Sequence, residues 1–174
     1  MTNPDITWTG RLAAAWGIGG VVLLLSSAVW RLTPLAIEAF AEPLSWVHWA
    51  FAVPWIFFMA YSEGYRGFQK GFSPRVVARA WSLLSRPRPH HVLLAPAIAM
   101  GWIHATKKRL IVSWCLTIGI VGLVLLVRLL PQPWRGLVDG GVVLGLGWGL
   151  TAIAVFTVAA LSGRPPAVPT DLPV

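Results

Sequence analysis

The chain has 174 residues, of which 56% are hydrophobic and only 11% are charged. Soluble domains are about one quarter charged, so this composition excludes a water-facing surface over most of the molecule and favours an integral membrane protein. The formal net charge of +8 does not indicate a nucleic-acid partner, because the basic residues flank apolar stretches, where Lys and Arg report membrane orientation and contact anionic lipid headgroups.

Four apolar stretches are predicted to span the membrane. Residues 12–30 contain no charge, and at about 1.5 Å per residue they reach about 28 Å, close to the hydrocarbon thickness. The other three predicted spans are residues 46–61, 110–127 and 138–161. The fold prediction is therefore an all-α integral membrane protein, with one four-helix transmembrane domain over residues 1–162 and a disordered Pro-rich tail over residues 163–174.

Residues 32–45 form the predicted connector between the first two spans, with prolines near both ends. Glu38 and Glu42 are four residues apart, which places both carboxylates on one helical face. A short surface helix explains them, and a proton or cation site is the alternative.

The second span is expected to continue as a helix to residue 72. Aromatic residues recur there at the spacing of one helical face, namely Tyr61, Tyr65, Phe68 and Phe72. Small residues form a second stripe suited to helix packing, namely Gly64, Gly67 and Gly71. A glycine-rich loop is the alternative.

Glu63, Arg66 and Gln69 form a polar cluster directly after the second span. The cluster is a candidate contact for a proton or a lipid headgroup. An ion pair within the helix between Glu63 and Arg66 is the simpler interpretation.

Ser73 and Pro74 predict the start of a basic amphipathic helix over residues 74–86, because Ser is a favoured N-cap and Pro a favoured first helical residue. Arginines line one face and apolar side chains the other, which is typical of a helix lying in the headgroup region or covering a partner. The predicted lipid or partner contacts are Arg75, Arg79, Trp81, Arg86 and Arg88.

Residues 92–106 are apolar but too short for a comfortable span, so they predict a re-entrant or interfacial helix. In the last span, Gly141, Gly145 and Gly149 are four residues apart, a pattern that favours close helix packing within this chain or with another. Asp139 at the start of that span is expected to form an ion pair with Arg128 or Arg135.

The basic residues also predict an orientation. If residues 61–109 face the cytoplasm, four spans place both termini inside and leave three basic residues outside, Arg31, Arg128 and Arg135. This pattern indicates an inner membrane of a bacterium.

Histidine could indicate b-type haem, which two imidazoles from facing helices can hold. His48 and His104 are the candidates, but the predicted helix directions place them at opposite ends of the bundle. No cofactor or metal site is therefore predicted, and without a nucleophile or phosphate-loop motif an enzymatic activity is not expected.

The sequence as a whole favours a small membrane interaction protein, an accessory subunit or assembly factor that packs against a membrane-protein partner or a second copy of itself. A homodimeric transporter or channel is the alternative, with Glu63, Arg128 and Asp139 near the pathway.

Overall fold

The structure is a computed structural model that describes residues 6–41, 43–85 and 88–170. Glu42 and Arg86, both singled out above, lie outside this part. The described part is helical and contains no strand. Its elements are α1 (Trp8–Ala41), α2 (Trp46–Met59), η1 (Ala60–Phe72), α3 (Ser73–Ser82), α4 (Pro89–Leu93), α5 (Ala95–Met100), α6 (Lys107–Val127) and α7 (Trp134–Leu161).

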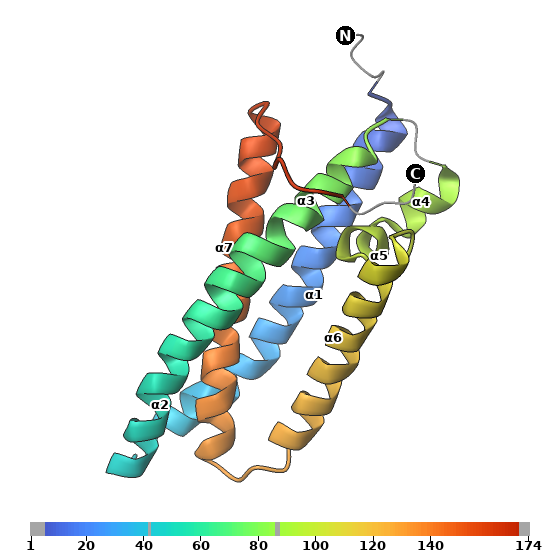
Figure 1. Cartoon of the computed structure of the whole chain (residues 1–174). Helices are drawn as coiled ribbons and strands as arrows, with labels where there is room; N and C mark the ends of the chain where they lie inside the picture. The colour runs from blue at the N-terminus through green and yellow to red at the C-terminus, as the bar shows by residue number, and fades with distance from the viewer. Residues whose placement is uncertain (1–5, 42, 86–87, 171–174) are drawn as a thin grey trace.

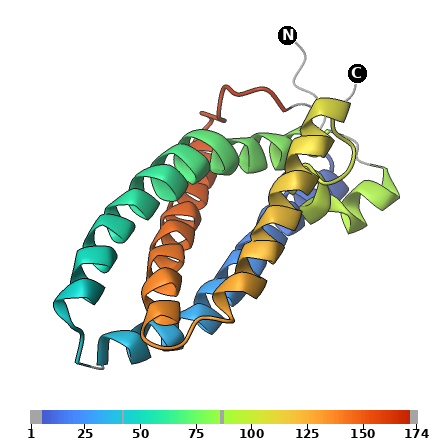
Figure 2. The same ribbon diagram turned by 60° about the horizontal axis from the view of Figure 1, so that its bottom comes forward.

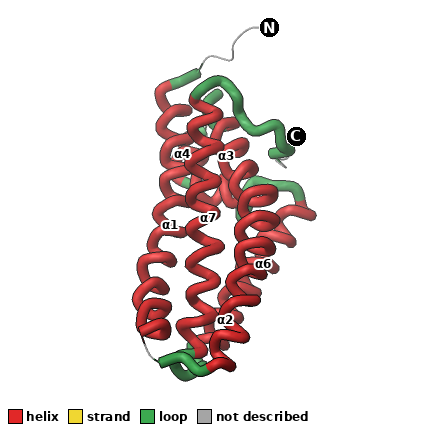
Figure 3. Tube along the Cα trace, turned by 90° about the vertical axis from the view of Figure 1, so that its left-hand side faces the viewer, coloured by secondary structure: helices red, strands yellow, loops and turns green. Residues whose placement is uncertain are grey.

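The long helices run alongside one another and alternate in direction (Figures 1 and 3). From one end of the bundle α1 descends, the run from α2 to α3 returns, α6 descends and α7 returns. The start of α1 and the end of α7 therefore lie at the same end of the molecule, together with α3, α4 and α5.

Three helices are long and apolar enough to cross a membrane, namely α1, α6 and α7. These helices are compatible with an integral membrane protein. The predicted fourth span is not confirmed, because α2 has 14 residues and reaches only about 21 Å at about 1.5 Å per residue. The helix continues as η1, but there it carries Glu63, Arg66 and Lys70.

Helix α1 is longer than the predicted first span, with 34 residues. The separate surface helix expected after residue 31 is wrong, because α1 continues through Pro34 as far as Ala41. The side-chain amide of Gln132, in the turn before α7, donates hydrogen bonds to the Leu35 carbonyl and to Glu38, each at 3.3 Å. These contacts tie the end of α1 to α7.

The second helix changes its winding without interruption. Helix α2 passes into the π-helix η1, which has 13 residues, and then into α3; Figure 2 shows the three as one continuous arch. The prediction that Ser73 caps a new helix is wrong, because its φ of −59° and ψ of −46° are helical. Its hydroxyl instead donates to the Gly149 carbonyl of α7 at 3.2 Å.

The predicted short apolar helix over residues 92–106 is two shorter helices, α4 and α5, followed by an irregular segment. Gly101 ends α5 with a φ of +75°, a conformation that glycine adopts without strain. Helix α5 packs between α1 and α3, and its residues Ala95, Ile98 and Ala99 are buried. It is part of the core at this end of the bundle.

The main hydrophobic core lies where α1, α3, α5 and α7 meet, and it includes Val21, Val76, Val77, Ala99 and Ile153. Helix α3 is thus packed against other helices of this chain, whereas the prediction was a helix lying in the headgroup region or covering a partner. Residues 163–170 turn back from α7 across α3 (Figure 1). Disorder was predicted for residues 163–174; of these, residues 171–174 lie outside the described part, and the carbonyl of Thr170 accepts a hydrogen bond from Arg79.

Candidate functional site

The glycine stripe of α7 packs against the helical run formed by α2 and η1. A Cβ added at Gly141 would collide with Trp55, one at Gly145 would lie 2.7 Å from Oε2 of Glu63, and one at Gly149 would collide with Phe68. All three glycines are buried. The predicted helix packing of this stripe is therefore satisfied within the chain, and the stripe is not available to another copy.

The second predicted stripe behaves differently. A Cβ at Gly64 would lie 3.0 Å from the indole of Trp148, so this glycine does allow close approach of α7. Gly67 and Gly71 would meet mainly backbone oxygens of their own helix. The prediction assumed α-helical spacing, but the wider i→i+5 winding of a π-helix rotates successive residues onto other faces.

The same winding separates the predicted polar cluster. Glu63 points towards Gly145 of α7, whereas Arg66 is exposed. Gln69 accepts a hydrogen bond from the Trp148 indole at 2.8 Å. Oε2 of Glu63 is buried and has no hydrogen-bond partner among the described residues.

Arg79 is fully buried, with 0% of its surface exposed. Its Nη1 donates to the Ala99 carbonyl at 3.2 Å, and its Nε donates to the Thr170 carbonyl at 2.7 Å. The amphipathic pattern had predicted that Arg79 contacts lipid or a partner, but the structure places it in the interior. It joins α3, α5 and the C-terminal segment.

The other predicted lipid or partner contacts occupy different environments. Arg75 is partly buried and donates to the Gly71 carbonyl at 2.9 Å. Trp81 is partly buried against the main core, and Arg88 is exposed. Only Arg88 of these three retains the free surface position that a headgroup contact requires.

The predicted ion pair lies within α7. Nε of Arg135 is 3.8 Å from Oδ2 of Asp139, an i,i+4 pair in which Asp139 is buried and Arg135 is partly exposed. Arg128 is exposed at the end of α6. The pair therefore lies within one helix and does not link α6 to α7.

The four histidines lie at two ends of the molecule. His48, in the first turn of α2, packs edge-on against Trp134 with ring centroids 4.8 Å apart. At the other end His90, His91 and His104 lie together, with centroids 4.4 Å apart for the first two and 5.0 Å for the last two. The two haem candidates, His48 and His104, are therefore not adjacent.

Burial lowers the pKa of His91, and the positive charges of His90, His104 and Arg88 lower it further. His104 has a φ of +51°, a left-handed conformation that is uncommon outside glycine. Across the described ranges, no group of three or more His, Cys, Asp or Glu side chains could hold a metal ion.

Helix α6 is the least buried of the three helices that could span a membrane. Only 6% of its most apolar window is buried, and no described helix packs extensively along it. Figure 2 shows it running apart from α7. Among the described residues, a Cβ at Gly119 or Gly122 would meet no atom within 4 Å outside the adjoining turns of its own helix, and the lone cysteine, Cys115, is exposed on the same helix.

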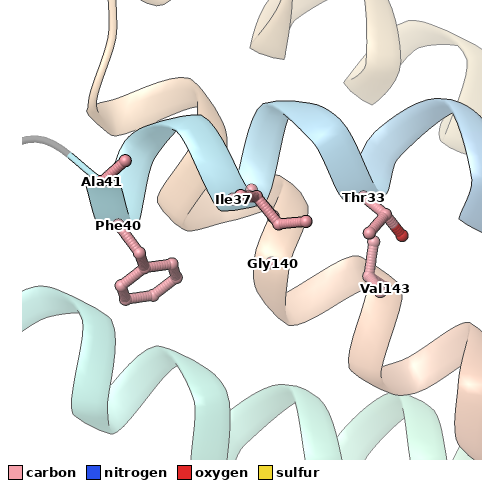
Figure 4. A pocket seen from close by; sticks show the side chains of 7 residues that line it. Thr33, Ile37, Phe40, Ala41, Gly140 and Val143 are labelled. Atoms are coloured by element: carbon pink, nitrogen blue, oxygen red, sulfur yellow. The ribbon is translucent and has the colours of Figure 1, made fainter.

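A shallow apolar pocket lies between the last turns of α1 and the first half of α7 (Figure 4). Its lining includes Thr33, Ile37, Phe40 and Val143. Thr33 supplies the only polar side chain among the described residues of this lining, and its hydroxyl donates to the Val29 carbonyl at 2.7 Å. The described lining therefore contains no general acid or base.

The sequence interpretation missed two sets of contacts. Gly10, Gly17 and Gly20 let α1 approach Leu84, Ala95 and Pro96 closely; their spacing of seven and three residues is a helical-face signal that could have identified them. The Trp55 indole donates to the Val138 carbonyl at 3.2 Å, and no local pattern predicts that contact.

No protein-family model, curated protein or solved structure matches this chain.

Proposed function

We propose that this protein is a small integral membrane interaction protein, an accessory subunit or assembly factor, and that α6 is the helix through which it binds another membrane protein. The observation that carries the proposal is the exposure of α6. It has 21 residues and almost none of its apolar window is buried, whereas α7 is packed on the α2–η1 run through three glycines.

The composition of α6 supports a role in helix association. Gly119 and Gly122 are three residues apart, which places both on one face of the helix, and neither meets a neighbouring element. Small residues allow two membrane helices to approach closely, and the resulting van der Waals contacts drive association where no hydrophobic effect operates between helices.

The same proposal includes an orientation. Exposed basic residues gather at the end of the bundle that holds the start of α1 and the end of α7, namely Arg11, Arg88, Lys107, Lys108 and Arg164. We place this end in the cytoplasm, beside the anionic headgroups of a bacterial inner membrane, because each basic side chain near such a surface contributes about 1 kcal/mol. The α2–η1 run then crosses the membrane with the other three helices.

A glycine-to-leucine comparison tests the binding role of α6. Gly119→Leu with Gly122→Leu adds two leucines to α6, and Gly147→Leu adds one leucine to α7, where a Cβ would also meet nothing within 4 Å among the described residues outside its own helix. The tagged protein is purified in mild detergent, and the chains that accompany it are identified by mass spectrometry and its size by chromatography.

We expect the α6 double variant to lose its partner chain, or its own oligomer, while Gly147→Leu retains it. Purification of the wild-type protein as a monomer without any accompanying chain would refute the proposed function. Equal retention of the partner by both variants would assign binding to another helix.

A further inference from the structure

We infer that Glu63 is an intramembrane proton-binding site, a carboxylic acid that holds its proton between η1 and α7 at neutral pH. The inference needs the chain to lie in a membrane but does not need α6 to have a partner. It rests on the position of one carboxyl group and on the groups that surround it.

The carboxyl group lies in a close helix–helix contact. A Cβ at Gly145 would be 2.7 Å from Oε2 of Glu63 and 3.0 Å from its Cβ, so a side chain at residue 145 would press on Glu63 in its present position. Oε2 is buried without a hydrogen-bond partner in the described part of the chain. Gly145 is near the middle of α7, which places the carboxyl group far from both ends of the bundle.

No cation faces this carboxyl group from the helices that enclose it. On α7, Arg135 pairs with Asp139 near the start of the helix. On η1, Arg66 is exposed, and Lys70 lies over the ring of Tyr65 at 4.5 Å from the ring centroid. The only ionisable side chain of α2 is His48, in its first turn.

These surroundings favour the neutral acid. An ionised carboxylate is very costly in apolar surroundings when no cation or hydrogen-bond donor compensates it. A protonated carboxyl group carries no charge and can remain against Gly145. Loss of the proton would leave an unpaired carboxylate on this partly buried side chain, with Oε2 enclosed beside Gly145.

The winding of η1 supports a specialised role for this position. A π-helix is rare, and η1, with 13 residues, is longer than the single-turn π-bulges usually found within α-helices. Here the winding turns Glu63 towards α7 while Arg66 points outwards, so the arginine that could neutralise the carboxylate within the helix is directed elsewhere.

Infrared spectroscopy of the protein in lipid vesicles tests the inference. A protonated carboxylic acid has a carbonyl stretching band that an ionised carboxylate lacks. We expect the spectrum at neutral pH to contain such a band, and we expect Glu63→Gln to remove it while Glu38→Gln, an exposed control on α1, leaves it unchanged. Absence of the band from the wild type would overturn the inference. Glu63 would then be an ionised carboxylate, whether free or bound to a metal cation.

A chemical measurement on the unaltered protein provides the second readout. Dicyclohexylcarbodiimide adds the O–H of a protonated carboxylic acid across one C=N bond, and the O-acylisourea rearranges to a stable N-acylurea without a leaving group. Peptide mapping should find the adduct on Glu63 and not on Glu38. An adduct confined to Glu38, or labelling of both that falls together as the pH rises, would contradict a proton held at Glu63. Neither result depends on whether α6 has a partner.

Discussion

The guanidinium group of Arg79 occupies the space in which a side chain of residue 101 would lie. A Cβ added at Gly101 would be 2.7 Å from Nη1 of Arg79, and the φ of Gly101 is +75°. Gly101→Ala is therefore expected to introduce both a steric conflict and a left-handed alanine, which alone costs about 1–2 kcal/mol. Thermal unfolding in detergent should show a lower midpoint than for Gly119→Ala, a glycine in open space. Equal midpoints would contradict this contact.

Arg79 is also expected to hold the C-terminal segment in place. Arg79→Met keeps a long apolar side chain but removes the donors to the carbonyls of Ala99 and Thr170, and each buried acceptor left unsatisfied costs about 1–3 kcal/mol. The variant should be less stable, and an added protease should cleave the chain faster within residues 163–170. Arg88→Met, at an exposed position, is the matched control. An unchanged cleavage rate in Arg79→Met would show that the tail is held by other contacts.

The role of Arg79 could not be predicted from its neighbours in the sequence. An amphipathic pattern identifies a polar helical face but not what covers it, and here the covering carbonyl, that of Thr170, lies 91 residues away. By contrast, the long helices α1, α6 and α7 follow from apolar length alone, and the contact face of α7 follows from its glycine spacing. The predicted alignment of Glu63 with Arg66 depended on α-helical winding, and no residue pattern signalled that the chain winds as a π-helix there.

Packing of α7 against η1 should depend on Gly149. A Cβ at this position would lie 2.6 Å from Cγ and 2.8 Å from Cε1 of the Phe68 ring, which itself packs edge-on against Phe72 with centroids 5.6 Å apart. Gly149→Ala is expected to reduce the free energy of unfolding by about 1–3 kcal/mol through overpacking. Gly147→Ala, on the same helix but in open space, should change it little. The prediction fails if the two variants unfold alike.

The histidine group should make the segment from residue 88 to residue 106 sensitive to acid. The pKa of His91 is lowered from its ordinary value of 6.5, so the unfolded segment takes up a proton more readily than the folded one. The folded segment therefore has its full stability relative to the unfolded segment above the ordinary pKa of histidine, and this stability decreases as the pH falls below that pKa. Hydrogen exchange of this segment should accelerate between about pH 7.5 and about pH 5.5 after correction for the intrinsic rate.

His91→Gln should weaken this acid response, because glutamine cannot be protonated in this range. His48→Gln, at the other end of the bundle beside Trp134, serves as the control and should retain the response. An acid response of equal size in wild type and His91→Gln would exclude His91 as its source.

The central claim, that α6 binds another membrane protein, can be tested most directly by photo-crosslinking in intact membranes. A photoreactive amino acid is placed at Gly122 of α6 and, as the control, at Leu23 of α1, which is 63% exposed. We predict that the probe on α6 forms a defined protein adduct, whose mass identifies a partner or a second copy, while the probe on α1 labels lipid. Lipid labelling alone from both positions would contradict the account.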